Sequence, residues 1–167
     1  MNKITITRMA DILAKHVDDH PKYGFAKQAV TPSVHKYEVA SPREGNQTVV
    51  AFYTLPPGKS NYPFHYHTTN EEVFYVIAGC GELESNDGMF PITAGDVIVC
   101  PAGEAGAHKI TNTHPTDALV YLDVDTNQTP DIAYYPRTGK VGIRHAGGMR
   151  DNFLLGSNVA YYDGEDE

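Results

Sequence analysis

Three histidines and one glutamate, gathered in two short blocks, are the residues of this chain best suited to chemistry. His65 and His67 are separated by one residue, Glu72 follows five positions after His67, and His108 lies in the second block. Imidazole nitrogens together with one carboxylate suit a first-row divalent ion such as Mn, Fe, Co, Ni or Zn. The four side chains therefore predict one divalent transition metal per chain.

The coordination number of the ion decides what such a site can do. On an octahedral ion, four protein ligands leave two adjacent positions for water, substrate or dioxygen. On a tetrahedral zinc ion the same four ligands close the site, which favours a structural role. The sequence leaves the identity of the metal open.

Strand geometry explains the His-x-His spacing. Alternate residues of a strand face the same side, so His65 and His67 share one face and Tyr66 points the other way. A turn over residues 68–70 would fold the chain back and bring Glu72 to the histidines from the neighbouring strand. Glu71 is adjacent and remains an alternative ligand. Outer-shell partners for the histidine rings are expected among Tyr62, Thr68, Thr69 and Asn112.

The elements that must position these ligands are short strands. Runs rich in β-forming residues alternate with Gly, Pro, Asn and Asp breaks between about residues 34 and 125, namely 49–53, 73–77, 97–100 and 119–124. Many short strands at this spacing predict an all-β sandwich or barrel, and the sequence Asn86-Asp87-Gly88 predicts a hairpin. Residues 9–17 predict a short helix, and the last 40 residues an irregular arm with a possible edge strand over 158–162.

Composition limits the partners. The 167 residues are expected to form a single domain with a net charge of −8 and no cluster of Lys or Arg, which argues against nucleic acid and anionic membranes. No run approaches the roughly 18 apolar residues of a membrane span, and the N-terminus lacks a secretory signal. We therefore expect a cytoplasmic protein whose partner is a small molecule.

The two blocks resemble the motifs of the cupin superfamily. In the first motif Gly58, His65, His67, Glu72 and Gly79 match, with one extra residue after Gly58. In the second motif the matching residues are Gly95, Pro101, Gly103, His108 and Asn112, with a lengthened loop over 104–107. The longer stretch is similar to a bacterial group of small cupins, mostly uncharacterised and in part labelled sugar-phosphate isomerases.

The resemblance implies a fold, a ligand set and an assembly. The fold is a double-stranded β-helix, the jelly-roll barrel of cupins, with its core at about 34–125. The implied metal ligands are His65, His67, Glu72 and His108. A homodimer is also implied, and the outward apolar side chains of the strand over 73–77 are the expected contact.

Three functions fit this site. The first is a metal-dependent isomerase acting on a sugar or sugar phosphate, for which the sequence offers no convincing catalytic base. A phosphate group would also need cations, and the sequence offers only Lys59, Lys109, Arg137 and Arg144. The second is an Fe-dependent dioxygenase with an apolar pocket built from Phe52, Phe64, Phe74 and Val76. The third is a non-enzymatic cupin that binds or senses a small ligand.

Overall fold

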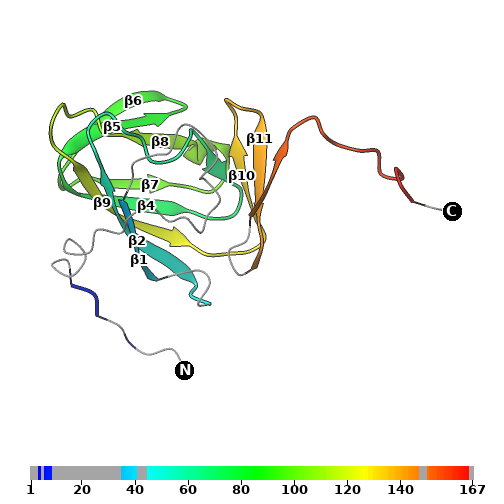
Figure 1. Ribbon diagram of the computed structural model, residues 1–167, viewed down its shortest axis with the longest axis horizontal. Coiled ribbons are helices and arrows are strands. Elements are labelled where there is room, and N and C mark those ends of the chain that lie inside the picture. The colour runs from blue at the N-terminus through cyan, green and yellow to red at the C-terminus, as the bar shows by residue number, and fades with distance from the viewer. Residues whose placement is uncertain (1–3, 5, 9–34, 41–44, 147–149, 166–167) are drawn as a thin grey trace.

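The computed structural model describes residues 4, 6–8, 35–40, 45–146 and 150–165, and β-strands dominate these residues (Figure 1). The expected helix over 9–17 lies outside the described residues. The strands are β1 (His35–Ala40), β2 (Thr48–Leu55), β3 (Tyr66–His67), β4 (Glu72–Ala78), β5 (Cys80–Ser85), β6 (Gly88–Thr93), β7 (Val97–Cys100), β8 (His108–Thr111), β9 (Leu119–Thr126), β10 (Asp131–Tyr135), β11 (Lys140–Arg144) and β12 (Arg150–Leu154). One 3-10 helix, η4 (Glu104–Gly106), precedes β8.

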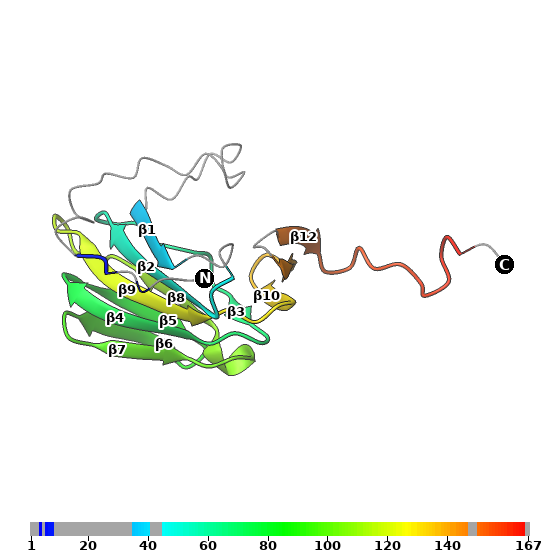
Figure 2. The ribbon, with the colours of Figure 1, turned by 90° about the horizontal axis from the view of Figure 1, so that it is seen from below.

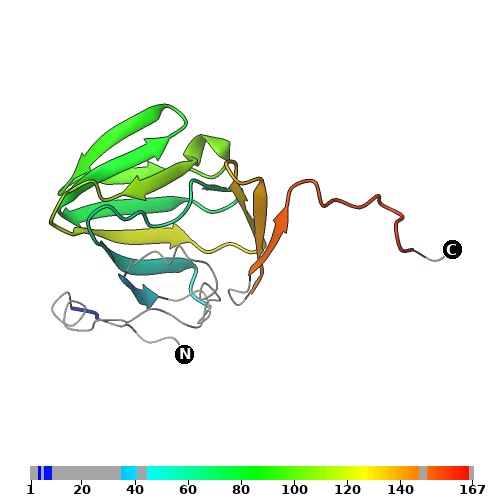
Figure 3. The same ribbon diagram turned by 45° about the horizontal axis from the view of Figure 1, so that its top comes forward.

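The strands form three antiparallel sheets. Sheet A has the order β1-β2-β9-β4-β7, sheet B the order β6-β5-β8, and sheet C the order β12-β11-β10-β3. Sheets A and B face each other as two layers, and sheet C stands at one end of them (Figures 1 and 3). Seen from below, the segment after β12 extends away from the barrel (Figure 2). This architecture confirms the expected all-β double-stranded β-helix.

Alternating burial along the strands of sheet A builds the core. In β2 the residues Ala51, Tyr53 and Leu55 are fully buried, whereas Phe52 between them is only half-buried. Residues Leu119 and Tyr121 of β9 are buried on the same side. Each fully buried large apolar side chain contributes about 1.5–3 kcal/mol to stability. The inner faces of the sheets therefore hold the barrel together and leave the outer faces to solvent.

The four predicted strands are confirmed, since residues 49–53, 73–77, 97–100 and 119–124 lie within β2, β4, β7 and β9. The predicted hairpin is also present. Ser85 pairs with Gly88, so Asn86 and Asp87 form a two-residue loop between β5 and β6. Among the described residues, no helix is long and apolar enough to cross a membrane.

The prediction of an irregular C-terminal arm is wrong for residues 131–135, 140–144 and 150–154, which are strands. Strands β10, β11 and β12 pair there in order, and residues 158–162 form no strand. The sequences Tyr134-Tyr135-Pro136 and Gly139-Lys140-Val141-Gly142 look irregular, yet the two tyrosines end β10 and residues 140–142 begin β11. The Thr138 N–H donates to the Tyr135 carbonyl at 3.1 Å and closes the turn between these strands. Pairing with β3 extends this hairpin into a sheet, and local sequence does not reveal such a contact.

Gly79 connects β4 to β5 at a point of close backbone approach. Its φ is +82°, and a Cβ there would collide with the Ala118 carbonyl oxygen and lie 3.0 Å from the Cα of Leu119. Gly95 has a similar positive φ of +99°, but nothing lies within 4 Å of a Cβ placed there. A side chain at Gly95 would therefore strain only the backbone, whereas a side chain at Gly79 would strain the backbone and also collide with its neighbours.

We expect Gly79→Ala to destabilise the protein more than Gly95→Ala does. Both changes incur about 1–2 kcal/mol for the left-handed backbone, and Gly79→Ala adds about 1–3 kcal/mol because the new methyl group overpacks the connection. Urea unfolding of the two variants and the wild type measures the difference. Equal losses of unfolding free energy would contradict the close approach at Gly79.

Candidate metal centre

The four predicted ligands come together from three sheets at one end of the barrel. His67 belongs to β3, Glu72 opens β4 and His108 opens β8. His65 lies just before β3 and is paired with His108 through two backbone hydrogen bonds of 3.1 and 2.9 Å. All four side chains are buried, with exposed fractions between 4% and 8%.

The imidazole Nε2 atoms converge on the carboxylate of Glu72. The Nε2 atoms of His65, His67 and His108 lie 3.9, 3.7 and 3.4 Å from its nearest oxygen. The ligand atoms of His65, His67 and Glu72 all lie within 4.8 Å of one another. Two ligand atoms about 2.1 Å from one ion are about 3.0–3.4 Å apart at octahedral or tetrahedral angles. The cluster is therefore close to the size that a metal ion needs.

Hydrogen bonds at Nδ1 orient each ring. His65 Nδ1 lies 2.9 Å from the Pro63 carbonyl oxygen, and His108 Nδ1 lies 2.9 Å from that of Gly106. His67 Nδ1 lies 2.5 Å from Asp131 Oδ2. Oxygen acceptors at Nδ1 require the proton there, which leaves the lone pair of each neutral ring on Nε2. Three lone pairs and a carboxylate facing one another fit a cation.

Asp131 is a member of the site that the sequence did not reveal. It is fully buried in β10, 64 residues after His67, and its Oδ1 accepts the Thr69 N–H at 3.2 Å. The expected outer-shell partners Tyr62, Thr68, Thr69 and Asn112 do not bind the Nδ1 atoms of the three histidines. The one sequence signal is an Asp that opens a β-rich run, and this is too common to identify a ligand partner.

The lengthened loop before β8 forms part of the ligand support. Glu104–Gly106 makes the 3-10 helix η4, whose last carbonyl holds His108. Gly106 packs so closely on Pro101 that a Cβ would collide with the Pro101 carbonyl. The extra residues therefore give His108 a rigid acceptor and do not displace it from the cluster.

Burial governs the charges of the site. It lowers the pKa of His65 well below its usual value and that of His108 to about 4, and it raises the pKa of Glu72 to about 7. Burial also opposes protonation of His67, but the hydrogen bond that His67 donates to Asp131 and the charge of Glu72 outweigh it and raise the His67 pKa. A cation bound among these groups would favour the ionised form of Glu72.

The structure also separates Glu72 from Glu71. Glu72 is buried and faces the histidines, whereas Glu71 is exposed. Phe74 and Val76 share the inner face of β4 with Glu72, as the alternation of side chains along a strand predicts. Phe52 does not, because it lies between Ala51 and Tyr53 and points to the opposite face of β2.

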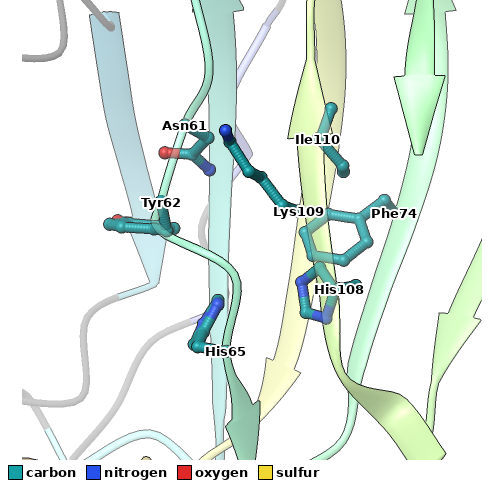
Figure 4. Close-up of a pocket in the computed structure, with 7 residues that line it drawn as sticks. All are labelled: Asn61, Tyr62, His65, Phe74, His108, Lys109 and Ile110. Carbon is teal, nitrogen blue, oxygen red and sulfur yellow. The ribbon is translucent and has the colours of Figure 1, made fainter. Parts of the chain in front are cut away.

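The barrel interior beside the cluster is rich in polar groups. Tyr53 and Tyr62 share a hydrogen bond of 2.9 Å between hydroxyls, and the Asn61 amide donates to the Tyr121 hydroxyl at 2.6 Å. A small cleft with room for about one water molecule lies here. In Figure 4, His65 and His108 face each other across it, with Phe74 next to His108. The cleft is lined by Asn61, Tyr62, His65, Phe74, His108, Lys109 and Ile110.

Two buried carboxyl groups lie beyond the ligands on β9. Asp123 pairs in register with Phe74, and Asp125 pairs with Glu72. Burial raises the pKa of both, and their side chains are hydrogen-bonded to each other. Oδ1 of each has no hydrogen-bond partner among the described residues. Two such carboxyls are more stable when they share one proton.

Known proteins resemble this chain in both sequence and structure. A model of the cupin domain matches residues 51–125. The oxalate-binding protein of Thermotoga maritima is 41% identical over 70 residues, which are 42% of this chain and 54% of that protein. The match thus spans about half the length of this curated relative.

Two solved structures extend the comparison. A sugar phosphate isomerase from a cupin superfamily of Silicibacter pomeroyi is 25% identical, with a TM-score of 0.64 over 77% of this chain and 82% of its own. A predicted oxalate decarboxylase of Thermotoga maritima is 33% identical, with a TM-score of 0.50 over 56% of this chain and 79% of its own. With the double-stranded β-helix and the two motifs in place, these similarities show that the chain belongs to the cupin superfamily.

Proposed function

We propose that this chain binds one divalent transition metal through His65, His67, Glu72 and His108, and that it is an isomerase of sugars or sugar phosphates. The observation that carries the proposal is the convergence of three Nε2 atoms and one carboxylate next to a pair of buried carboxyl groups. The name of the Silicibacter pomeroyi relative supports the same substrate class.

Isomerisation of a hydroxy-carbonyl compound moves a proton between adjacent carbons, so it needs an acid–base group near the bound oxygens. A metal in this site would act as a Lewis acid toward those oxygens. Asp123 and Asp125, sharing one proton, present an ionised oxygen and a protonated one side by side. We assign the proton transfer to Oδ1 of Asp123, which lies on the inner face and lacks a partner among the described residues.

The surroundings favour this proposal over a dioxygenase. A dioxygenase was expected to enclose the site with Phe52, Phe64, Phe74 and Val76, but Phe52 faces away. Tyrosine hydroxyls and an asparagine amide line much of the interior instead. Such groups bind the hydroxyls of a sugar and hold them in place.

A second candidate is non-catalytic binding of a small dicarboxylate such as oxalate. The specific observation in its favour is the 41% identity to the oxalate-binding protein over 70 residues. A dicarboxylate that coordinates the metal would need no proton transfer, so this function would leave the Asp123–Asp125 pair without a role.

We propose further that the protein is a homodimer joined through the outer face of sheet A. Val73 pairs with Val99 and Tyr75 pairs with Val97 across β4 and β7. The side chains of Tyr75, Val97 and Val99 are 45–63% exposed. β7 is the edge strand of the sheet. An apolar patch at a strand edge is a typical site of pairing with a second copy.

The metal assignment predicts which variants lose the ion. His67→Ala, His108→Ala and Glu72→Gln should lose most of the metal, because each removes one ligand atom from the cluster. Glu71→Gln is the matched control, since Glu71 is the exposed neighbour, and it should retain about one ion per chain. Elemental analysis of the purified proteins measures this. Full metal content in the His67 and His108 variants would disprove the four-ligand site.

The isomerase proposal predicts turnover of a sugar or sugar phosphate by the metal-loaded protein without oxygen. Asp123→Asn should lower kcat by about 10²–10⁴-fold, the usual contribution of an acid–base group, and leave the metal content unchanged. Asp117→Asn, at an exposed position, is the control. Oxygen uptake coupled to turnover would instead favour a dioxygenase, and tight oxalate binding without turnover of any sugar would favour the binding protein.

The dimer proposal predicts a mass of two chains in light scattering at micromolar concentration. The double change Val97→Glu and Val99→Glu should give monomers, because four charges in the dimer would have to be buried together. Met89→Glu, which charges an exposed apolar position on β6, should leave the dimer intact. A wild-type protein of monomer mass would contradict the proposal.

A further inference from the structure

Sheet C places two arginines on the face that carries Asp131. Asp131 pairs in register with Arg144 on β11, and Arg144 pairs with Arg150 on β12. Residues directly opposite one another on neighbouring strands lie on the same face of a sheet. Because Asp131 binds His67 from that face, both arginines project from the face nearest the proposed metal ligands.

Arg144 has donors that no described residue accepts. Its Nε and Nη2 atoms are buried and have no hydrogen-bond partner. The opposite carboxylate is already engaged, because Asp131 holds the His67 ring and the Thr69 N–H. A buried charged donor without an acceptor is costly, so this guanidinium favours an additional anionic oxygen beside it.

Arg150 is exposed, and its side chain crosses the neighbouring strand to reach Tyr135. Its Nη1 donates to the Tyr135 hydroxyl at 2.7 Å, and the Tyr135 ring stacks on His65 with 5.6 Å between centroids. The side chain passes over Gly142, where a Cβ would lie 3.2 Å from Arg150 Cδ and 2.8 Å from Asn152 Oδ1. The missing side chain at Gly142 thus gives Arg150 its path toward His65.

The two guanidinium groups need a shared counter-charge. Like charges directly opposite each other across strands repel, and here Arg144 faces Arg150. The planar fork of a guanidinium matches the oxygens of a phosphate or carboxylate. An anionic group between the two arginines would relieve both the repulsion and the unpaired donors.

We infer that Arg144 and Arg150 form an anion-binding subsite beside the metal centre, which takes a phosphate or carboxylate group of the substrate. The inference rests on the proposed function for the identity of the neighbouring centre. It narrows the substrate from sugars in general to compounds with an anionic group. It also explains how a chain of net charge −8, with Glu72, Asp123 and Asp125 close by, can accept an anion.

Calorimetric titration of the metal-loaded full chain with inorganic phosphate, and separately with oxalate, tests the subsite. Arg144→Gln and Arg150→Gln should each weaken binding by about tenfold or more, as expected for loss of a charge-assisted hydrogen bond. Gly142→Ala should also weaken it, because the methyl group displaces Arg150. A larger loss of affinity for phosphate than for oxalate in the arginine variants identifies a phosphate subsite, and the reverse identifies a carboxylate subsite.

Arg137→Gln is the matched control. Arg137 lies in the turn between β10 and β11, pairs with Glu84 and covers the Phe64 ring at 4.8 Å, so its loss should leave anion affinity unchanged. Metal content is measured for every variant, so that a lost ion is not mistaken for a lost subsite. Equal affinity of the wild type and of all metal-loaded arginine variants would overturn the inference, because the anion would then bind the metal alone.

Failure of the subsite and failure of the isomerase proposal give different results. If the arginine variants lose phosphate affinity but no sugar is turned over, the subsite stands and the isomerase proposal falls. If a phosphorylated sugar is turned over with the same KM in wild type and Arg150→Gln, the isomerase proposal stands and the subsite falls. A KM that rises for the phosphorylated sugar, with kcat nearly unchanged, supports both.

Discussion

The hydrogen bonds at the three Nδ1 atoms are the constraint on which the site depends. The acceptors are the carbonyls of Pro63 and Gly106 and the carboxylate of Asp131. Each one requires a proton on Nδ1 and leaves the Nε2 lone pair facing Glu72. Four electron-rich groups are thus held together inside the barrel. A cation between them would be attracted by all four groups at once.

Those acceptors tie the metal centre to the rest of the fold. The Gly106 carbonyl depends on η4, and Asp131 depends on the pairing of β10 with β3. Sheet C therefore supports His67 from one end, while the pairing of β4 with β9 brings the Asp123–Asp125 pair beside Glu72. The proposed ligands come from all three sheets, the proposed acid–base pair from sheet A and the two arginines from sheet C.

Local pattern predicted much of this arrangement. Alternation along the chain was enough to put His65 and His67 on one face, because a strand repeats every two residues. Glu72 was expected on the neighbouring strand, but it approaches the histidines from another sheet, because β3 pairs with β10 and β4 pairs with β7 and β9. The four strands of sheet A with strong β-forming runs were predicted for the same reason. Asp131, Tyr135 and Arg150 were not predicted as site residues, since each reaches the site through strand pairing between distant segments.

The sequence by itself determined the ligand types, their spacing and the all-β class, because side-chain chemistry and strand periodicity are local properties. Only the tertiary structure shows that Glu72 faces the histidines while Glu71 is exposed, since burial of one and exposure of the other follow from the register of β4 against β9. It also shows that the apparently irregular residues 131–135, 140–144 and 150–154 pair as a sheet. Register and strand pairing depend on contacts between segments far apart in the chain, and these contacts leave no local pattern in the sequence.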